Sequence, residues 1–198
     1  MADVFTWRIA GRTAGPLADD WRERLVARLG QRPRRLGQHA ELAVFGALEA
    51  LAAAGETALP PDTLLRVCSL RGPAAAIGQA LDQAKSDLPL PFSFLQSQPS
   101  QMLAAIAASL QWQGDASFVL MRDPLALITL AARQARQRGM LLGWVEESPG
   151  HSQWLRLIPS AAPPQPFVTV TSLAHLSAPE TRWLQLQPAG IVLAGSMD

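Results

Sequence analysis

The stretch ASFVLMRDPLALITLAARQARQRGMLLGWVEE, residues 116–147, decides the fold. Its start, ASFVLM at 116–121, has the β-branched and aromatic content of a strand. Pro124 suits the first turn of the helix that we expect over 125–138. The apolar run MLLGWVEE at 140–147 then predicts a second strand. A strand, a helix and a strand in this order indicate an α/β layered unit.

The same alternation extends along the rest of the chain. The expected strands cover 3–10, 64–70, 153–159 and 190–195, and the expected helices cover 21–30, with Asp19 or Asp20 as a possible cap, 38–54, 74–86 and 102–109. The segment 88–101 is rich in Pro, Ser and Gln and predicts an irregular loop, and 161–166 predicts an extended connector. Together the pattern predicts one α/β domain over 1–198, with helices covering a mixed sheet.

Composition excludes several functional classes. With 17 basic and 16 acidic residues, the formal charge of +1 gives no net field that would attract nucleic acid or an anionic membrane. The single cysteine, Cys68, can form neither an internal disulfide nor a multi-thiolate zinc site. The chain shows no signal-peptide pattern and no uninterrupted run of about 18 apolar residues. We therefore expect a cytoplasmic protein that holds no metal or cofactor.

Four segments resemble the N-terminal half of β-ketoacyl synthases, specifically short synthase-like proteins of the chain-length-factor type. They are RRLGQHAELAVFGALEAL at 34–51, SLRG at 69–72, PFSFLQSQPSQMLAAIAASLQWQGDASFVLMRD at 91–123 and LLGWVEE at 141–147. The expected helix at 125–138, between the last two segments, shares the resemblance. The resemblance is best over 34–147, and it implies a thiolase-like fold, truncated to the ketosynthase N-terminal half.

The resemblance also places Asp123 at the position where active synthases carry their cysteine nucleophile. A helix N-terminus stabilises a thiolate there, but an aspartate is no thiol nucleophile. Asp123 before Pro124 can equally be a plain helix cap. The family also needs histidines, or a histidine and an asparagine, from a C-terminal half. The three histidines of this chain lie in none of those motifs: His39, His151 and His175.

The resemblance implies that this chain is the non-catalytic subunit of a heterodimer with a full-length catalytic ketosynthase. Synthases of this fold pair through strands beside the nucleophile segment, and the inactive subunit shapes the acyl tunnel of the active one. The acyl carrier protein is then an indirect partner, and the resemblance further points to aryl polyene pigment pathways of the xanthomonadin type. The tunnel or interface candidates, for which core packing is the alternative, are Phe92, Phe94, Gln98, Met102, Phe118, Leu120 and Met121.

The residues themselves are also compatible with two other functions. A stand-alone enzyme acting on acyl thioesters would use Asp123 or Cys68, although Cys68 lies in an apolar strand pattern typical of a small buried side chain. An orphan module could capture a carrier protein, and the basic group Arg32, Arg34 and Arg35 could dock its acidic surface or simply be solvated.

Two further expectations concern the C-terminal part. The neighbours His151 and Ser152 do not indicate a hydrolase, because adjacent residues on a strand point to opposite faces and the chain has no G-x-S-x-G turn. Since half of a two-layer core needs covering, we expect an exposed apolar face within 150–198.

Overall fold

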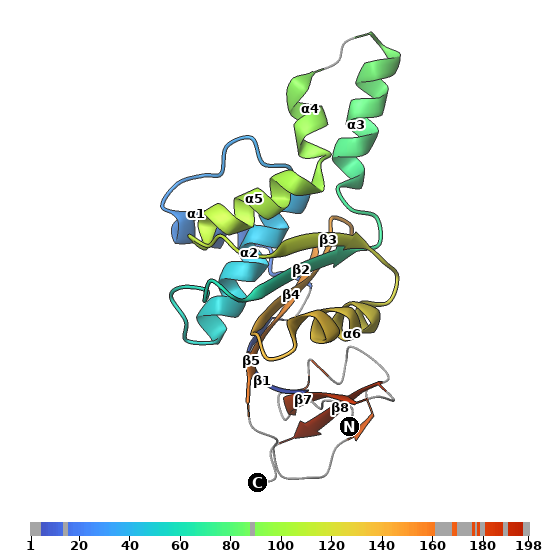
Figure 1. Ribbon diagram of the computed structural model, residues 1–198. Helices are drawn as coiled ribbons and strands as arrows, with labels where there is room; N and C mark the ends of the chain where they lie inside the picture. Colours follow the sequence, from blue (N-terminus) through green and yellow to red (C-terminus); the bar gives the residue numbers. More distant parts are fainter. Residues whose placement is uncertain are drawn as a thin grey trace.

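The computed structural model describes residues 5–13, 16–87, 90–160, 168–169, 176, 178, 181–187 and 190–195 (Figure 1). Its strands are β1 (Phe5–Thr13), β2 (Leu64–Ser69), β3 (Ala116–Leu120), β4 (Met140–Glu146), β5 (His151–Pro159), β6 (Val168–Thr169), β7 (Thr181–Gln187) and β8 (Gly190–Gly195). Its helices are α1 (Trp21–Leu29), α2 (Gln38–Ala53), α3 (Ala74–Lys85), α4 (Pro91–Gln96), α5 (Pro99–Ser109) and α6 (Pro124–Ala135).

The strands form one mixed sheet with the order β3-β2-β4-β5-β1-β7-β8-β6. Strand β2, next to one edge of the sheet, pairs in parallel with β3 on one side and with β4 on the other. All remaining neighbours pair antiparallel, beginning with β4 and β5. Strand β3 therefore lies at one edge of the sheet, and its outer side has no neighbouring strand among the described residues.

Helices cover both faces of the sheet because the apolar residues of the strands alternate between two cores. On one face, α2 and α5 pack on Leu65, Val67 and Trp154. On the other face, α6 packs on strand residues such as Leu64 and Leu142. The helix α2 is buried along most of its length, since alanines and Gly46 let it lie close to the sheet. The predicted mixed sheet layered with helices is confirmed.

Most of the expected elements are present, and one prediction was wrong. Segment 88–101 was expected to be an irregular loop, but α4 occupies Pro91–Gln96 and α5 begins at Pro99. Both prolines stand at the first turn of a helix, where proline is favoured because that N–H has no partner within the helix. The prolines thus mark two helix starts. The expected connector 161–166 lies outside the described residues.

The expected apolar face within 150–198 is not found in the part of that range that the structure describes. Leu184, Leu186, Ile191 and Leu193, from β7 and β8, are buried in the same core as α6. Strand β7 was not predicted from the sequence. These C-terminal strands extend the sheet beyond β1 and cover apolar surface on the α6 side. No helix in the described part of the chain is long and apolar enough to span a membrane.

Candidate functional site

The carboxyl ends of the parallel strands β2, β3 and β4 lie together at one end of the sheet. The carboxyl ends of parallel strands are where α/β proteins commonly place functional groups. Three features meet there: the turn after β2, which leads into α3, the turn after β3, which leads into α6, and the acidic pair Glu146 and Glu147 at the end of β4. These turns correspond to the SLRG and MRDP segments of the sequence.

Asp123 caps α6. Its Oδ1 accepts a hydrogen bond of 2.9 Å from the backbone N–H of Leu125, and Pro124 is the first residue of the helix. The interpretation of Asp123 as a helix cap is confirmed. The carboxylate is exposed and already satisfies one free donor of the helix end.

Cys68 lies inside β2 and is fully buried. Burial, with a further contribution from Glu146, raises the pKa of its thiol to about 12. The thiol is therefore protonated at neutral pH, and only the thiolate is a nucleophile. The expectation that Cys68 is a small buried side chain is confirmed.

Cys68 is expected to resist thiol reagents in the native protein. At pH 8 a thiol with a pKa of about 12 is ionised in only about one molecule in ten thousand, and the buried strand also blocks access. A chromogenic disulfide reagent should report almost no thiol before denaturant is added and one thiol per chain afterwards. Rapid stoichiometric labelling of the native chain would contradict this placement of Cys68.

The carboxylates at the end of β4 hold the turn between β2 and α3. Ser69 Oγ donates to Glu146 Oε1 at 3.0 Å, and the N–H of Leu70 donates to the same oxygen. The N–H of Gly72 donates back to Ser69 Oγ at 2.7 Å. Glu147 Oε2 accepts from the N–H of Ala75 at 2.8 Å, in the first turn of α3. The pair thus fixes the base of α3 to the sheet, a role that the sequence did not indicate.

Helices α3 and α4 pack on each other and project away from the sheet as an arm, which we define as residues 70–87 and 90–96 (Figure 1). The arm carries most of the exposed large apolar side chains of the described chain. They are Leu70, Ile77, Leu81, Leu90, Phe92, Phe94 and Leu95, and the two remaining ones are Leu120 on β3 and Leu130 on α6.

The predicted site residues fall into different environments. On the arm, Phe92 and Phe94 are exposed, and Phe94 has 62% of its surface accessible. Gln98 precedes α5 and is half-buried, whereas Met102 is buried in the core with α2. The structure therefore places Phe92 and Phe94 on α4, two positions apart, and separates Met102 from the surface.

The edge strand β3 divides its candidates between the two faces of the sheet. Phe118 is half-buried and packs edge-to-face on His39, with ring centroids 5.9 Å apart. Leu120 lies on the same face and is 63% exposed. Met121 packs on the opposite face, against the core of α6. Phe118 and Leu120 are thus the candidates from β3 that face away from α6.

The backbone of β3 also presents free groups at the sheet edge. The N–H of Met121 donates to Ser69 at 3.0 Å, and the N–H of Leu65 donates to Asp115 at 3.0 Å. In a parallel ladder, alternate residues bond to the same neighbour. The N–H and C=O groups of Phe118 and Leu120 therefore point away from β2, toward the open edge.

His39 is buried beside this strand, at the start of α2. Burial lowers the pKa of its imidazole, although Glu147 partly opposes that shift. His39 is therefore neutral at pH 7 and packs as a core residue on Phe118. His151 begins β5, and His175 lies outside the described residues.

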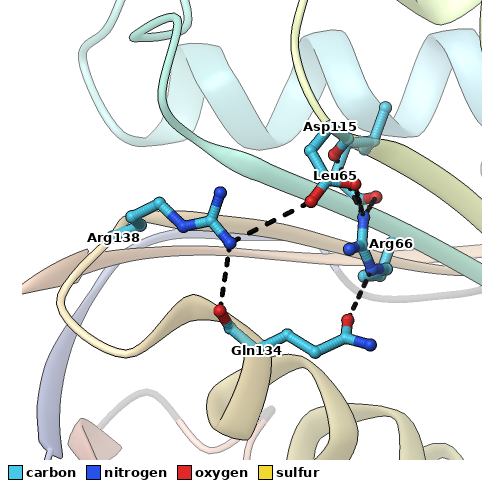
Figure 2. Close-up of polar contacts among 5 residues, drawn as sticks. All are labelled: Leu65, Arg66, Asp115, Gln134 and Arg138. Atoms are coloured by element: carbon cyan, nitrogen blue, oxygen red, sulfur yellow. Dashed lines mark hydrogen bonds and ion pairs between the residues drawn. The ribbon is translucent and has the colours of Figure 1, made fainter.

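At the opposite end of the same strands, a polar cluster fixes the edge of the sheet (Figure 2). The buried Arg66 of β2 donates to Asp115 Oδ1 and to Gln134 Oε1, each at 2.9 Å. The hydrogen bond from Arg66 lowers the pKa of Asp115. Arg138 donates to the backbone oxygen of Gln134 at 3.0 Å. The guanidinium of Arg66 bonds to both Asp115 and Gln134, so the cluster joins β2 to the residue before β3 and to the end of α6.

A basic loop precedes α2. Arg32 and Arg34 stand at the rim of a hollow of about 480 Å³ whose other lining residues include Leu36 and Ala105. The guanidinium of Arg35 lies 5.1 Å from the ring centre of Phe92 on the arm. The loop is therefore a cationic surface with an aliphatic floor.

Among solved structures, the fold is similar to ketosynthase and chain-length-factor assemblies. The ishigamide ketosynthase/chain length factor matches with a TM-score of 0.55 and 14% identity, over 79% of this chain and 59% of that chain. A ketosynthase (ApeO) in complex with its chain length factor (ApeC) from Xenorhabdus doucetiae gives 0.52 and 18%, over 81% and 79%. The complex AntDE:AntF, a type II PKS acyl-carrier protein with its ketosynthase, gives 0.56 and 12%, over 78% and 63%.

These matches define the class of fold: this chain has the thiolase-like α/β fold of ketosynthases and chain length factors. It spans about three-fifths of the ishigamide and AntDE:AntF chains that it matches. No family model and no curated protein sequence matches it.

Proposed function

We propose that this chain is a non-catalytic, chain-length-factor-like partner subunit of a catalytic ketosynthase. The observation that carries the proposal is the start of α6, where Asp123 acts as a helix cap at the position that the sequence resemblance assigns to the nucleophile. The single cysteine of the chain lies elsewhere and is held as a buried, protonated thiol. A subunit built in this way depends on the nucleophile of another chain.

The open edge of the sheet supports pairing with such a chain. The backbone N–H and C=O groups of Phe118 and Leu120 point outward from β3, and the side chain of Leu120 is apolar and exposed. Phe92, Phe94 and Gln98 are the candidates that we expect to wall the partner's acyl tunnel. Met102 lies behind them in the core of α2 and α5, and Met121 lies on the opposite face of the sheet, beside the start of α6. On the sequence resemblance we also propose aryl polyene biosynthesis as the pathway, and on composition the cytoplasm as the location.

A carrier-protein-binding module is the second candidate. The observation in its favour is the basic loop, since Arg32 and Arg34 make no ion pair with any described residue and border an aliphatic hollow. Acidic partners are attracted to such a surface. This function is compatible with the first one if the carrier protein visits the assembled heterodimer.

The test is co-expression of this chain with a full-length ketosynthase from the same genome, followed by size exclusion with mass determination and a condensation assay on a carrier-bound substrate. We expect a stable heterodimer that condenses only when both chains are present. Asp123→Ala should keep this activity and lose about 1 kcal/mol of stability with the cap. The proposal fails if the chain remains alone in the presence of the ketosynthase, or if it turns over a thioester unaided.

A further inference from the structure

We propose that a hollow at the end of α6 is a binding site for a small anion that carries a flat ring, such as the phosphate monoester of an aromatic compound. The hollow has a volume of about 710 Å³, and its lining residues are Phe5, Gln134, Ala135, Arg136, Gln137 and Arg138. Small-molecule sites have volumes of about 300–1,000 Å³. The inference goes beyond the proposed function, because such a site needs no ketosynthase.

The first argument is the charge of the hollow. Two of its lining residues are arginines, and none is acidic. Arg136 is exposed and forms no ion pair with any residue that the structure describes. Arg138 Nη2 lies 4.0 Å from Asp115 Oδ2, while the other oxygen of this carboxylate accepts from Arg66 (Figure 2). One carboxylate thus faces three guanidiniums, so the hollow keeps a positive charge, and the planar donors of arginine match phosphate oxygens.

The end of α6 does not oppose an anion at this place. Free carbonyl groups give the C-terminus of a helix a partial negative charge. Here the carbonyl of Ala132 accepts from the N–H of Arg136 at 3.3 Å, and that of Ala135 accepts from the N–H of Arg138 at 2.9 Å. The carbonyl of Gln134 accepts from the side chain of Arg138 at 3.0 Å. These bonds and the charge of Arg138 compensate the helix end, and Arg136 is left to bind a ligand.

The second argument is the backbone of Arg136, which follows the last residue of α6. Its φ of 53° and ψ of −103° lie outside the regions that residues with a side chain ordinarily adopt. Strained residues of this kind cluster where proteins bind ligands. Glycine would adopt this conformation with less strain, but it would supply no guanidinium. The turn places Arg136, Gln137 and Arg138 together in the lining of the hollow.

The third argument is that the hollow also has groups for a ring. Phe5 is half-buried, and its ring centre lies 6.2 Å from that of Trp7. Trp7 Nε1 in turn donates to the backbone oxygen of Arg138 at 2.9 Å, which fixes the aromatic pair beside the arginines. A flat ring can stack on Phe5, and the amides of Gln134 and Gln137 can bond polar atoms at the ring edge. An aliphatic anion would use none of these groups.

The experiment measures the affinity of the full chain for adenosine monophosphate, a probe that contains both a flat ring and a phosphate, by titration calorimetry. We expect a dissociation constant on the order of 0.1 mM. Inorganic phosphate and adenosine should each bind at least about tenfold more weakly, since each uses only part of the lining. Arg136→Gln should weaken binding of the probe at least about tenfold. Arg133→Gln is the matched control, because Arg133 is exposed in the last turn of α6 but does not line the hollow, and it should change the affinity less than about twofold.

Arg136→Gly separates binding from folding. This variant should lose binding of the probe to the same extent as Arg136→Gln. Because glycine relieves the backbone strain, it should unfold at the wild-type temperature or up to about 4 °C higher. A lower unfolding temperature together with unchanged binding would mean that Arg136 only ends the helix, and the inference would be wrong.

Two further outcomes would overturn the inference. If the wild-type chain does not bind adenosine monophosphate, or if Arg133→Gln weakens binding as much as Arg136→Gln, the hollow is not a specific site. If inorganic phosphate binds as tightly as the probe, Phe5 and the amides recognise no ring. None of these results affects pairing with a ketosynthase, because the hollow lies at the end of α6 and Asp123, which precedes Pro124, lies at its start.

Discussion

Replacing Leu120 with proline is expected to abolish the heterodimer with the ketosynthase while leaving the fold of this chain intact. The N–H of Leu120 points to the open edge of the sheet, because the neighbouring N–H of Met121 is the one that bonds to β2. Proline removes that outward donor, and edge strands tolerate proline because no internal hydrogen bond is lost. Size exclusion with mass determination should show two separate chains in place of one complex.

Leu120→Ala is the matched control, because it keeps the N–H and removes only the apolar side chain. We expect the alanine variant to bind the ketosynthase more weakly than the wild type but more tightly than the proline variant, whose affinity should fall at least about a hundredfold. Circular dichroism should give the same spectrum for all three chains. An intact complex with Leu120→Pro would mean that β3 does not pair with the partner through its backbone.

The layered fold could be predicted from the sequence because its strands and helices repeat simple patterns. The run from 116 to 147 contains a strand, a proline-started helix and a second strand, and all three are present at nearly the expected bounds. Helix α4 was missed because proline signals both a loop and a helix start, and only the neighbouring chain decides between them. Strand β7 was missed because Gln185 and Gln187 interrupt its apolar pattern.

The candidate site was only partly predictable. Asp123 could be predicted as a cap, since an aspartate before a proline is a local signal. The function of Glu146 and Glu147 could not be predicted, because their partners Ser69 and Ala75 lie more than 70 residues away. Similarly, only the packing of α2 and α5 reveals that Met102 is a core residue.

Gly46→Ala is expected to lower the free energy of unfolding by about 3 kcal/mol, a large part of the margin of a typical domain. A Cβ at this position would lie 2.2 Å from Ser152 Oγ and 2.2 Å from Trp154 Nε1. Neither atom can move freely, because Ser152 Oγ donates to Leu42 at 2.7 Å and Trp154 Nε1 donates to Ser152 Oγ at 2.9 Å. Urea denaturation followed by tryptophan fluorescence should show the loss as a lower midpoint.

Gly78→Ala provides the control for this substitution, because Gly78 also lies within a helix and a Cβ there would meet no atom within 4 Å. Alanine is the better helix former, so this variant should be as stable as the wild type or more stable by up to about 1 kcal/mol. The two substitutions have the same intrinsic effect on a helix, and their difference isolates the contact between α2 and Trp154. Equal stability of the two variants would show that α2 can shift away from the sheet and that the close approach at Gly46 is not required for the fold.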